Sequence, residues 1–334
     1  MPPLSIIMPY KLDKVNQRIL YELDKNCRIS DSQLAKKVRK SREAVRNRIK
    51  KLVDDGIIEG FLASTNPSKV GYTFFKLYFQ LANIPEERKK FYDYFKKLPG
   101  LYWFGGNDGI WDFHTTMYAK NLEEINKIKN QIFTDFKHLI IKRDIGILLN
   151  VRQFPKNWIS GTITERNEPA IFAGEIEFNQ MDVLDKEILG NLTHNGRISL
   201  VELSRTVKSS VDIVRNRIKK MEDKGIIMQY RIAVNYTKLG YEMFKAFLYF
   251  YHLSDKDERK LVESVRQQPS VVYLIRQLSA WDVELEMICK NYEEFTKIIN
   301  SLREKFSDVL RNYEFCLMRE DIWHFGEKDI FEGV

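Results

Sequence analysis

The sequence predicts an α+β fold that is built twice, each copy being a winged helix-turn-helix followed by a βαββαβ domain. The first observation is an internal repeat: Asp13–Ile58 aligns with Asp182–Ile227 without a gap, and 22 of the 46 positions are identical. The repeat includes the heptapeptide VRNRIKK, at residues 45–51 and 214–220. The second observation is that the apolar period changes from helical to alternating after this segment in both copies. These observations indicate that the chain is a tandem duplication of a unit of about 150 residues.

The repeat predicts four domains in two equivalent pairs. Residues 154–178 lie between the copies, are rich in proline and glycine, and carry neither a helical nor a strand period, so we expect a linker there. This segment also holds Trp158, which is too apolar for a free tether, and we expect it to pack on one of the modules. The expected boundaries are 10–62 and 179–231 for the two winged helix-turn-helix modules, 63–153 and 232–320 for the two ferredoxin-like domains, and 321–334 for a C-terminal tail.

Three short helices are expected at the start of each copy. Ile19 and Leu23 keep the spacing of an amphipathic first helix. The S-x-x-Q/E patterns that start at Ser30 and Ser199 are capping boxes, which begin a second helix. A short turn and a serine cap then lead to a third helix, and two helices joined in this way form a helix-turn-helix. A glycine followed by two isoleucines after the third helix predicts a wing-like β element.

The third helix of each copy carries the candidate functional residues. Val45, Ile49 and Leu52 face inward, which leaves an outward stripe of basic and amide side chains. Arginine pairs with guanine, asparagine with adenine, and lysine neutralises phosphate, so such a helix suits a DNA major groove. A solvated helix face is the alternative for a basic run alone, but the stripe recurs in both copies. The expected DNA-binding residues are Ser41, Arg42, Arg46, Asn47 and Lys50 in copy one and Ser210, Arg215, Asn216 and Lys219 in copy two.

The positive charge is concentrated in these modules. The chain has a net charge of +8, from 54 basic and 46 acidic residues. Residues 10–60 hold 14 basic and 8 acidic side chains, and residues 179–231 hold 10 and 7. The two segments together carry the whole excess, as DNA binding by counterion release requires. We expect the first copy, which is the more basic, to supply more of the non-specific affinity.

The second half of each copy predicts a sheet with helices. The order βαββαβ is that of the ferredoxin-like fold. Such a sheet leaves one face open, and these strands are rich in Phe, Tyr and Leu, so we expect another copy, in the same or a second chain, to cover it. The expected strands are 73–81, 101–104, 111–119 and 139–149, then 242–253, 271–276, 281–289 and 309–317; the expected helices are 85–98, 121–133, 255–268 and 291–306.

These features together resemble the Lrp/AsnC (feast/famine) transcriptional regulators. The likeness rests on N-x-R-I-S from Asn26, Leu-Ala from Leu34 and R-x-R-I-x-x-L from Arg46, followed by a ferredoxin-like domain of the type that family calls RAM. It covers nearly the whole chain, twice. Single-unit members of that family dimerise through this domain and bind palindrome-like DNA. The resemblance therefore implies such a dimer fused into one chain, a form that the family has in archaea, with double-stranded DNA as partner and further homo-oligomers left open.

The resemblance also implies an amino-acid effector site near a Gly-x-Tyr-Asp motif that opens the third strand. Copy one has Gly-Ile-Trp-Asp and copy two has Ser-Ala-Trp-Asp, and the last strands lack the family's small hydroxyl residues. Tryptophan and aspartate at such positions are more often structural than ligand-binding. We expect no tight binding of a common amino acid, or at most one altered site. The candidate effector residues are Gly109, Asp112, Ser279 and Asp282.

Two alternative functions stay open at this point. Siroheme decarboxylases are built from the same two modules and have lost DNA binding, but such an enzyme needs a histidine over its tetrapyrrole. The second alternative is a transcription-associated scaffold with vestigial helix-turn-helix modules. The retained Arg/Asn/Lys stripes favour DNA binding over both. The chain has five histidines, none at equivalent positions in the two copies: His114, His138, His194, His252 and His324.

Composition excludes several other classes. The apolar fraction of 44% supports real cores, and no apolar run approaches the roughly 20 residues of a membrane helix. Cys27, Cys289 and Cys316 lie far apart without a C-x-x-C pair, which argues against a disulfide framework or a cysteine zinc site. We find no Gly-rich phosphate loop, metal-ligand cluster or nucleophile elbow. We therefore expect no enzymatic activity, no cofactor, no membrane partner, and a cytoplasmic, nucleoid-associated protein.

Overall fold

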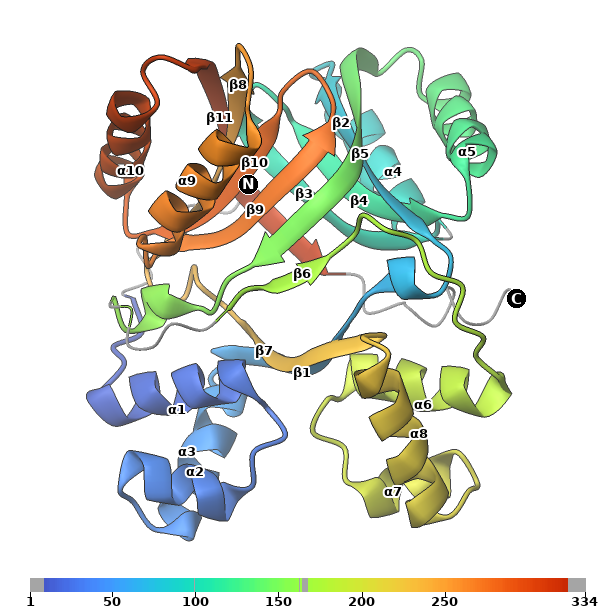
Figure 1. The fold of residues 1–334 in the computed structure, drawn as a ribbon, viewed down its shortest axis with the longest axis vertical. Coiled ribbons are helices and arrows are strands. Elements are labelled where there is room, and N and C mark those ends of the chain that lie inside the picture. Colours follow the sequence, from blue (N-terminus) through green and yellow to red (C-terminus); the bar gives the residue numbers. More distant parts are fainter. Residues whose placement is uncertain (1–8, 99, 162, 164–167, 324–334) are drawn as a thin grey trace.

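The chain folds into a lower layer of two helical modules and an upper layer of strands flanked by helices (Figure 1). The computed structural model describes residues 9–98, 100–161, 163 and 168–323. The predicted fold class is confirmed, because each copy supplies three helices, one strand and a βαββαβ unit. In this part of the chain no helix has the length and apolar character needed to cross a membrane.

The helices of the two modules begin at the polar caps that the sequence indicates. The side chains of Ser30, Ser41, Ser199 and Ser210 each accept the backbone N–H of the residue three positions on. At Ser30 the reciprocal bond is also present, so the predicted capping box is complete. The helices are α1 (Lys14–Lys25), α2 (Asp31–Val38) and α3 (Arg42–Asp54) in copy one, and α6 (Val183–His194), α7 (Leu200–Thr206) and α8 (Val211–Asp223) in copy two.

The predicted wing forms as a single strand in each copy, and its partner is the other copy. β1 (Ile58–Thr65) pairs antiparallel with β7 (Ile227–Val234). Leu62 and Arg231, which are equivalent in the repeat, pair with each other, so a pseudo-two-fold axis passes through this β1–β7 ribbon. The physical reason is that one strand alone leaves its backbone N–H and C=O groups without partners, and the equivalent strand supplies them.

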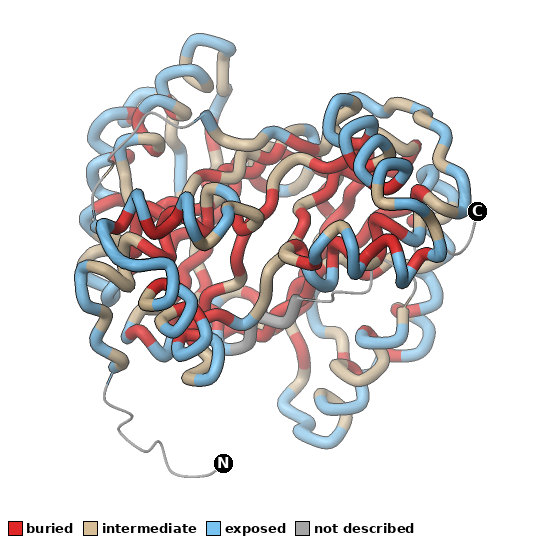
Figure 2. The backbone as a smooth tube through the Cα atoms, turned by 90° about the horizontal axis from the view of Figure 1, so that it is seen from below, coloured by how far each residue is buried: buried red, intermediate tan, exposed pale blue. Residues whose placement is uncertain are grey.

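The strands of the upper layer form a closed eight-stranded ring, which we call the barrel. Each ferredoxin-like unit has one four-stranded sheet, and the edge strand of each pairs with the edge of the other. The open face of each sheet is thus covered by the other copy in the same chain, and Figure 2 shows the buried backbone concentrated in these strands. Copy one contributes β2 (Thr73–Leu81), α4 (Pro85–Phe95), β3 (Leu101–Gly109), β4 (Phe113–Ala119), α5 (Leu122–Asp135) and β5 (Ile140–Gln153); copy two contributes β8 (Glu242–Phe250), α9 (Asp255–Arg266), β9 (Val271–Leu278), β10 (Val283–Cys289), α10 (Tyr292–Lys305) and β11 (Leu310–Trp323).

Several strands extend beyond their predicted ends. β3, β5 and β11 are longer than expected because their far halves pair with the other copy: β3 with β11, and β5 with β9. β11 therefore enters the expected tail, where Trp323 pairs with Trp103 of β3. The rest of that tail, residues 324–334, lies outside the described residues. An apolar pattern read within one copy does not show a pairing of this kind.

The expectation that residues 154–178 contain no strand is wrong. A 3-10 turn covers Asn157–Ile159, and β6 (Ala170–Phe172) pairs with β5 at the edge of the barrel. Trp158 is buried, and its ring lies 4.9 Å, centroid to centroid, from that of Tyr241. The segment packs on the protein, as its apolar residues indicate.

The three cysteines do not form disulfides. Cys27, Cys289 and Cys316 are all buried free thiols.

The barrel interior holds a buried charge cluster. Lys76 and Lys245 are equivalent in the repeat, and their ammonium groups lie 2.9 and 3.1 Å from the same oxygen of Glu284. Lys245 also bonds Glu286, and the Tyr78 hydroxyl donates to Glu284 at 2.7 Å. Burial raises the pKa of Glu284, but the two lysines outweigh it and hold that pKa at about 2. The carboxylate is therefore ionised at neutral pH in spite of its burial.

Both carboxylates of this cluster come from copy two. His114 and Thr116 occupy the equivalent positions in copy one. His114 is fully buried, and desolvation together with Lys245 and Lys76 holds its pKa well below the ordinary value, so it stays neutral. The two lysines and two glutamates are consequently neutral as a group only when copy one pairs with copy two. This gives the fused chain a core that differs from that of a symmetric dimer.

The cluster predicts a loss of stability in acid. A carboxylate whose folded-state pKa is depressed stabilises the fold above its ordinary pKa, and this contribution is lost as the pH falls towards the folded-state value. For Glu284 that window lies between about pH 4.5 and pH 2. We expect the urea midpoint of the full chain to fall across this window. The Glu284→Gln variant should start from a lower midpoint and decline less steeply; an equal slope in both proteins would contradict the assignment.

Candidate nucleic-acid interface

The predicted DNA-binding side chains lie on the outer faces of α3 and α8. On α3, Val45, Ile49 and Leu52 are buried and the stripe beside them is exposed. α8 repeats this with Val214, Ile218 and Met221 as its buried face. Both modules lie at the same end of the molecule, away from the barrel (Figure 1). The structure places these predicted residues at exposed positions on α3 and α8 or at their caps: Ser41, Arg42, Arg46, Asn47, Lys50, Ser210, Arg215, Asn216 and Lys219.

The remaining arginine of each heptapeptide has a different task. Arg48 donates to Asp13 at 2.7 Å and to Asn16 at 2.8 Å. Its equivalent Arg217 donates to Asp182 at 2.6 Å. Because the aspartates cap α1 and α6, these bonds fasten each recognition helix to the first helix of its own module. Arg48 and Arg217 therefore fix the position of the stripe and are not part of it.

The turn between the second and third helices of each module has a strained backbone. Arg39 has φ of 55° and its equivalent Lys208 has φ of 51°, the left-handed region that non-glycine residues enter at a cost of roughly 1–2 kcal/mol. The same conformation at both positions shows that the turn itself requires it.

Replacing either residue by glycine should stabilise the protein. We expect Arg39→Gly and Lys208→Gly each to raise the free energy of unfolding by about 1 kcal/mol, because glycine adopts this φ without a steric penalty. Urea denaturation measures the change. Lys40→Gly is the matched control, since it removes a neighbouring cation at a position without positive φ. If the control stabilised the protein as much as the two glycine variants, strain would not be the cause.

Asp31 links the recognition helix of copy one to copy two. Its carboxylate accepts from Arg46 at 3.2 Å and from Arg197 at 2.9 Å. The equivalent of Asp31 is Leu200, so copy two lacks this link, and there Arg215 pairs with Asp212 on its own helix. Sequence reasoning missed Asp31 as a site residue. Its place at the first turn of α2 is the one available signal, and that position usually indicates only a favourable helix end.

Backbone contacts through the ribbon set the relation between the two modules. The N–H of Cys27 donates to Tyr230 O at 2.8 Å, and the equivalent N–H of Gly196 donates to Phe61 O at 2.7 Å. A Cβ at Gly196 would lie 2.8 Å from the backbone of Leu62, so the loop approaches β1 more closely here than a side chain allows without a shift, whereas copy one has Cys27 at the equivalent position. The loop after the first helix of each module thus bonds the ribbon strand of the other copy. The two recognition helices are held by one shared element.

A buried ion pair fastens copy one to the same ribbon. Arg231 of β7 donates to both oxygens of Asp24 in α1, at 3.0 and 2.6 Å, and Lys156 donates to Asp24 at 2.8 Å. Burial raises the pKa of Asp24, but Arg231 and Lys156 outweigh it and hold that pKa well below the ordinary range. The equivalents of Asp24 and Arg231 are Thr193 and Leu62, so the pair exists on one side of the pseudo-two-fold axis.

Of the four candidate effector residues, Asp112 lies in the β3–β4 turn, Ser279 and Asp282 lie in the β9–β10 turn, and Gly109 is the last residue of β3. Asp112 accepts from the N–H of Leu81 at 2.8 Å, and Asp282 accepts from the N–H of Phe250 at 2.8 Å. Ser279 donates to Trp281 O at 2.7 Å. A Cβ at Gly109, whose φ is +133°, would lie 2.8 Å from Phe315 O in β11. The contacts that these four residues make thus lie within the turns or between the two copies.

Comparisons with known proteins identify both helix-turn-helix modules. A winged helix-turn-helix DNA-binding family model matches residues 12–59, and an AsnC-type helix-turn-helix model matches residues 181–222. An HTH-type transcriptional regulator of Pyrococcus horikoshii is 37% identical over 123 residues, which are 36% of this chain and 82% of that protein. The regulator LrpB of Bacillus subtilis is 43% identical over 72 residues, 22% of this chain and 48% of its own.

A solved structure shares the fold over almost the whole chain. The siroheme decarboxylase NirDL superposes with a TM-score of 0.62 over 96% of this chain and 97% of its own, at 15% sequence identity. This likeness shows a common fold. Family membership rests on the sequence matches and on the two helix-turn-helix modules that they cover. The chain belongs to the Lrp/AsnC family of HTH-type transcriptional regulators.

Proposed function

We propose that the chain is a sequence-specific DNA-binding transcriptional regulator that presents α3 and α8 to two half-sites in the major groove. The observation that carries this proposal is the equivalent exposed stripe on both helices, with Asn47 matched by Asn216 and Lys50 by Lys219. The ribbon and the barrel hold these helices in a defined relation, as a dimer of single-unit regulators would. The ferredoxin-like domains pair the two copies with each other. The partner of the whole chain is double-stranded DNA.

The two half-sites are expected to differ. Copy one has Arg42 where copy two has Val211, and Arg46 is held by Asp31 whereas Arg215 is held by Asp212. Different side chains at equivalent positions favour different bases. A fused chain therefore suits an asymmetric operator, which a symmetric homodimer does not match as well.

An enzyme on this fold is the second candidate, favoured by the likeness to NirDL. Two features of this chain weigh against it. A tetrapyrrole with several carboxylates requires unpaired cations at its binding site. Lys156 and Arg231 line the cavity beside the β1–β7 ribbon, and both are paired with Asp24. His114 is enclosed in the barrel and stays neutral, so it is a poor proton donor. We therefore favour the regulator.

Selection of bound duplexes from a random DNA pool tests the proposal. We expect the full chain to recover one motif with two unlike halves. Recovery of no motif would contradict the proposal and favour a scaffold. Titration with iron-uroporphyrin III separates the enzyme, because a decarboxylase of this type would change the visible absorption of the tetrapyrrole on binding, and we expect no such change.

A further inference from the structure

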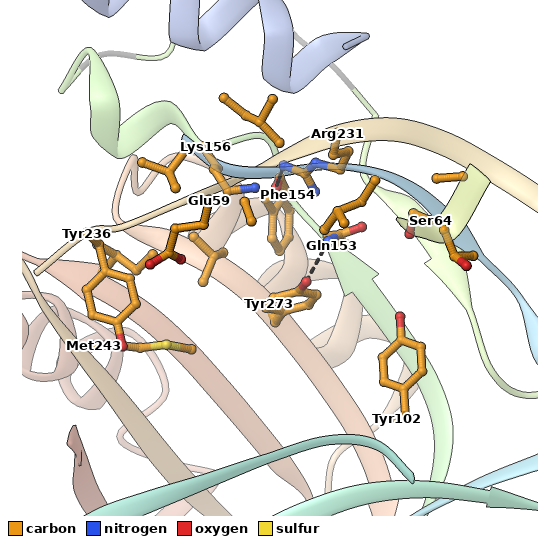
Figure 3. Close-up of a pocket in the computed structure, with 18 residues that line it drawn as sticks. Glu59, Ser64, Tyr102, Gln153, Phe154, Lys156, Arg231, Tyr236, Met243 and Tyr273 are labelled. Atoms are coloured by element: carbon orange, nitrogen blue, oxygen red, sulfur yellow. Dashed lines mark hydrogen bonds between the residues drawn. The ribbon is translucent and has the colours of Figure 1, made fainter. Parts of the chain in front are cut away.

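A cavity lies between the β1–β7 ribbon and the lower mouth of the barrel (Figure 3). Its solvent-accessible volume is about 130 Å³, and it is partly open to solvent. Its walls come from the ribbon, from barrel strands of both copies and from Phe154. Tyr102, Met243 and Tyr273 also line a second cavity, which continues into the barrel as far as Lys76. The space is thus lined by residues of both copies, from the ribbon and from the barrel.

The cations at this cavity are already neutralised. Lys156 and Arg231 line it, and both are paired with the buried carboxylate of Asp24. Arg231 also donates to Phe154 O at 3.0 Å. The third charged residue of the lining, Glu59, is an exposed carboxylate that accepts from Asn235 at 2.7 Å. An anionic ligand would therefore meet no unpaired cation among these residues.

One acceptor at the cavity is left without a donor. The Nε2 group of Gln153 donates to the hydroxyl of Tyr273, as the dashed line in Figure 3 marks. Its other atom, Oε1, is buried and receives no hydrogen bond from the described part of the chain. A buried acceptor without a partner costs roughly 1–3 kcal/mol. A ligand that donates to Oε1 removes this cost.

We propose that the cavity binds a neutral, mainly aromatic small molecule that carries one N–H or O–H donor directed at Gln153 Oε1. The rings of Phe154, Tyr102 and Tyr236 line the space and offer faces and edges to a planar ligand (Figure 3). A largely apolar enclosure with few polar groups is the usual form of a small-molecule site. This site is separate from the turns that hold Asp112 and Asp282.

Fluorescence titration of the full chain tests the proposal. The probe is N-phenyl-1-naphthylamine, which is neutral, aromatic and carries one N–H. We expect a saturable rise in fluorescence with one probe per chain. The anionic relative 1-anilinonaphthalene-8-sulfonate has the same rings, and we expect it to bind at least tenfold more weakly because it finds no unpaired cation. A rise that does not saturate, or tighter binding of the sulfonate, would overturn the proposal.

Variants locate the probe. Gln153→Leu should weaken its binding about five- to tenfold, by the loss of one hydrogen bond. Gln131→Leu, the same change on the exposed face of α5, should leave the probe's binding unaltered. Ser64→Phe adds bulk to the cavity wall and should abolish binding. Circular dichroism of each variant shows whether it is folded, and unaltered binding by a folded Ser64→Phe or Gln153→Leu protein overturns the site. None of these measurements uses DNA, so their failure leaves the proposed function standing.

Discussion

Lys245→Met is expected to lower the free energy of unfolding of the full chain by about 3–5 kcal/mol. The ammonium group of Lys245 is fully buried between Glu284 and Glu286, and it lies 4.4 Å from the centre of the Trp103 ring. Methionine fills a similar volume, so the loss comes from two buried carboxylates that keep one lysine in place of two. Urea denaturation at pH 7 gives the difference directly.

A surface pair provides the matched control. Lys89 and Asp93 form an ion pair at 2.7 Å on the exposed face of α4, and Lys89→Met should cost less than about 1 kcal/mol. The double variant Lys245→Met, Glu286→Gln should recover a large part of the single variant's loss, because it removes the uncompensated charge. If Lys245→Met cost no more than Lys89→Met, the buried cluster would not contribute as described.

Asn47→Ala and Asn216→Ala are each expected to weaken binding to the selected duplex by about 1–3 kcal/mol, which is roughly five- to 150-fold. Each asparagine is exposed on α3 or α8. In the proposed function each pairs with adenine in one half-site. Because the two positions belong to separate half-sites, we expect their effects to add in the double variant. Equilibrium binding at one fixed salt concentration measures all three variants.

Asn130→Ala is the control for these variants. Asn130 is an exposed helical asparagine on α5, which flanks the barrel, so its replacement should leave DNA affinity unchanged. The proposal that both helices read DNA would be contradicted if Asn216→Ala behaved like Asn130→Ala while Asn47→Ala weakened binding. In that case one module alone would read the duplex.

Local patterns predict the helices, their caps and the order of the strands. The serine caps at Ser41 and Ser210 and the buried faces of α3 and α8 follow from spacing within a few residues. The β1–β7 ribbon and the closure of the barrel do not, because each joins segments that lie far apart in the sequence. A repeat shows that two strands are equivalent without showing that they pair with each other.

The polar contacts between the copies were beyond sequence reasoning for the same cause. Asp24 and Arg231 lie 207 residues apart, and nothing near either residue indicates the other. Lys76 and Lys245 did leave a signal, since each is a single lysine inside an otherwise apolar, aromatic strand. Such a residue indicates a buried charge, but its partners Glu284 and Glu286 become evident only once β10 lies beside β8.

In the proposed function one chain reads two half-sites with two recognition helices, α3 and α8. Hydroxyl-radical footprinting of the full chain on the selected duplex tests it most directly. We predict two protected segments on one face of the DNA, centred about one helical turn or a whole multiple of a turn apart. Asn47→Ala should weaken one segment first and Asn216→Ala the other. A single protected segment that responds to one of the two variants alone would contradict the claim.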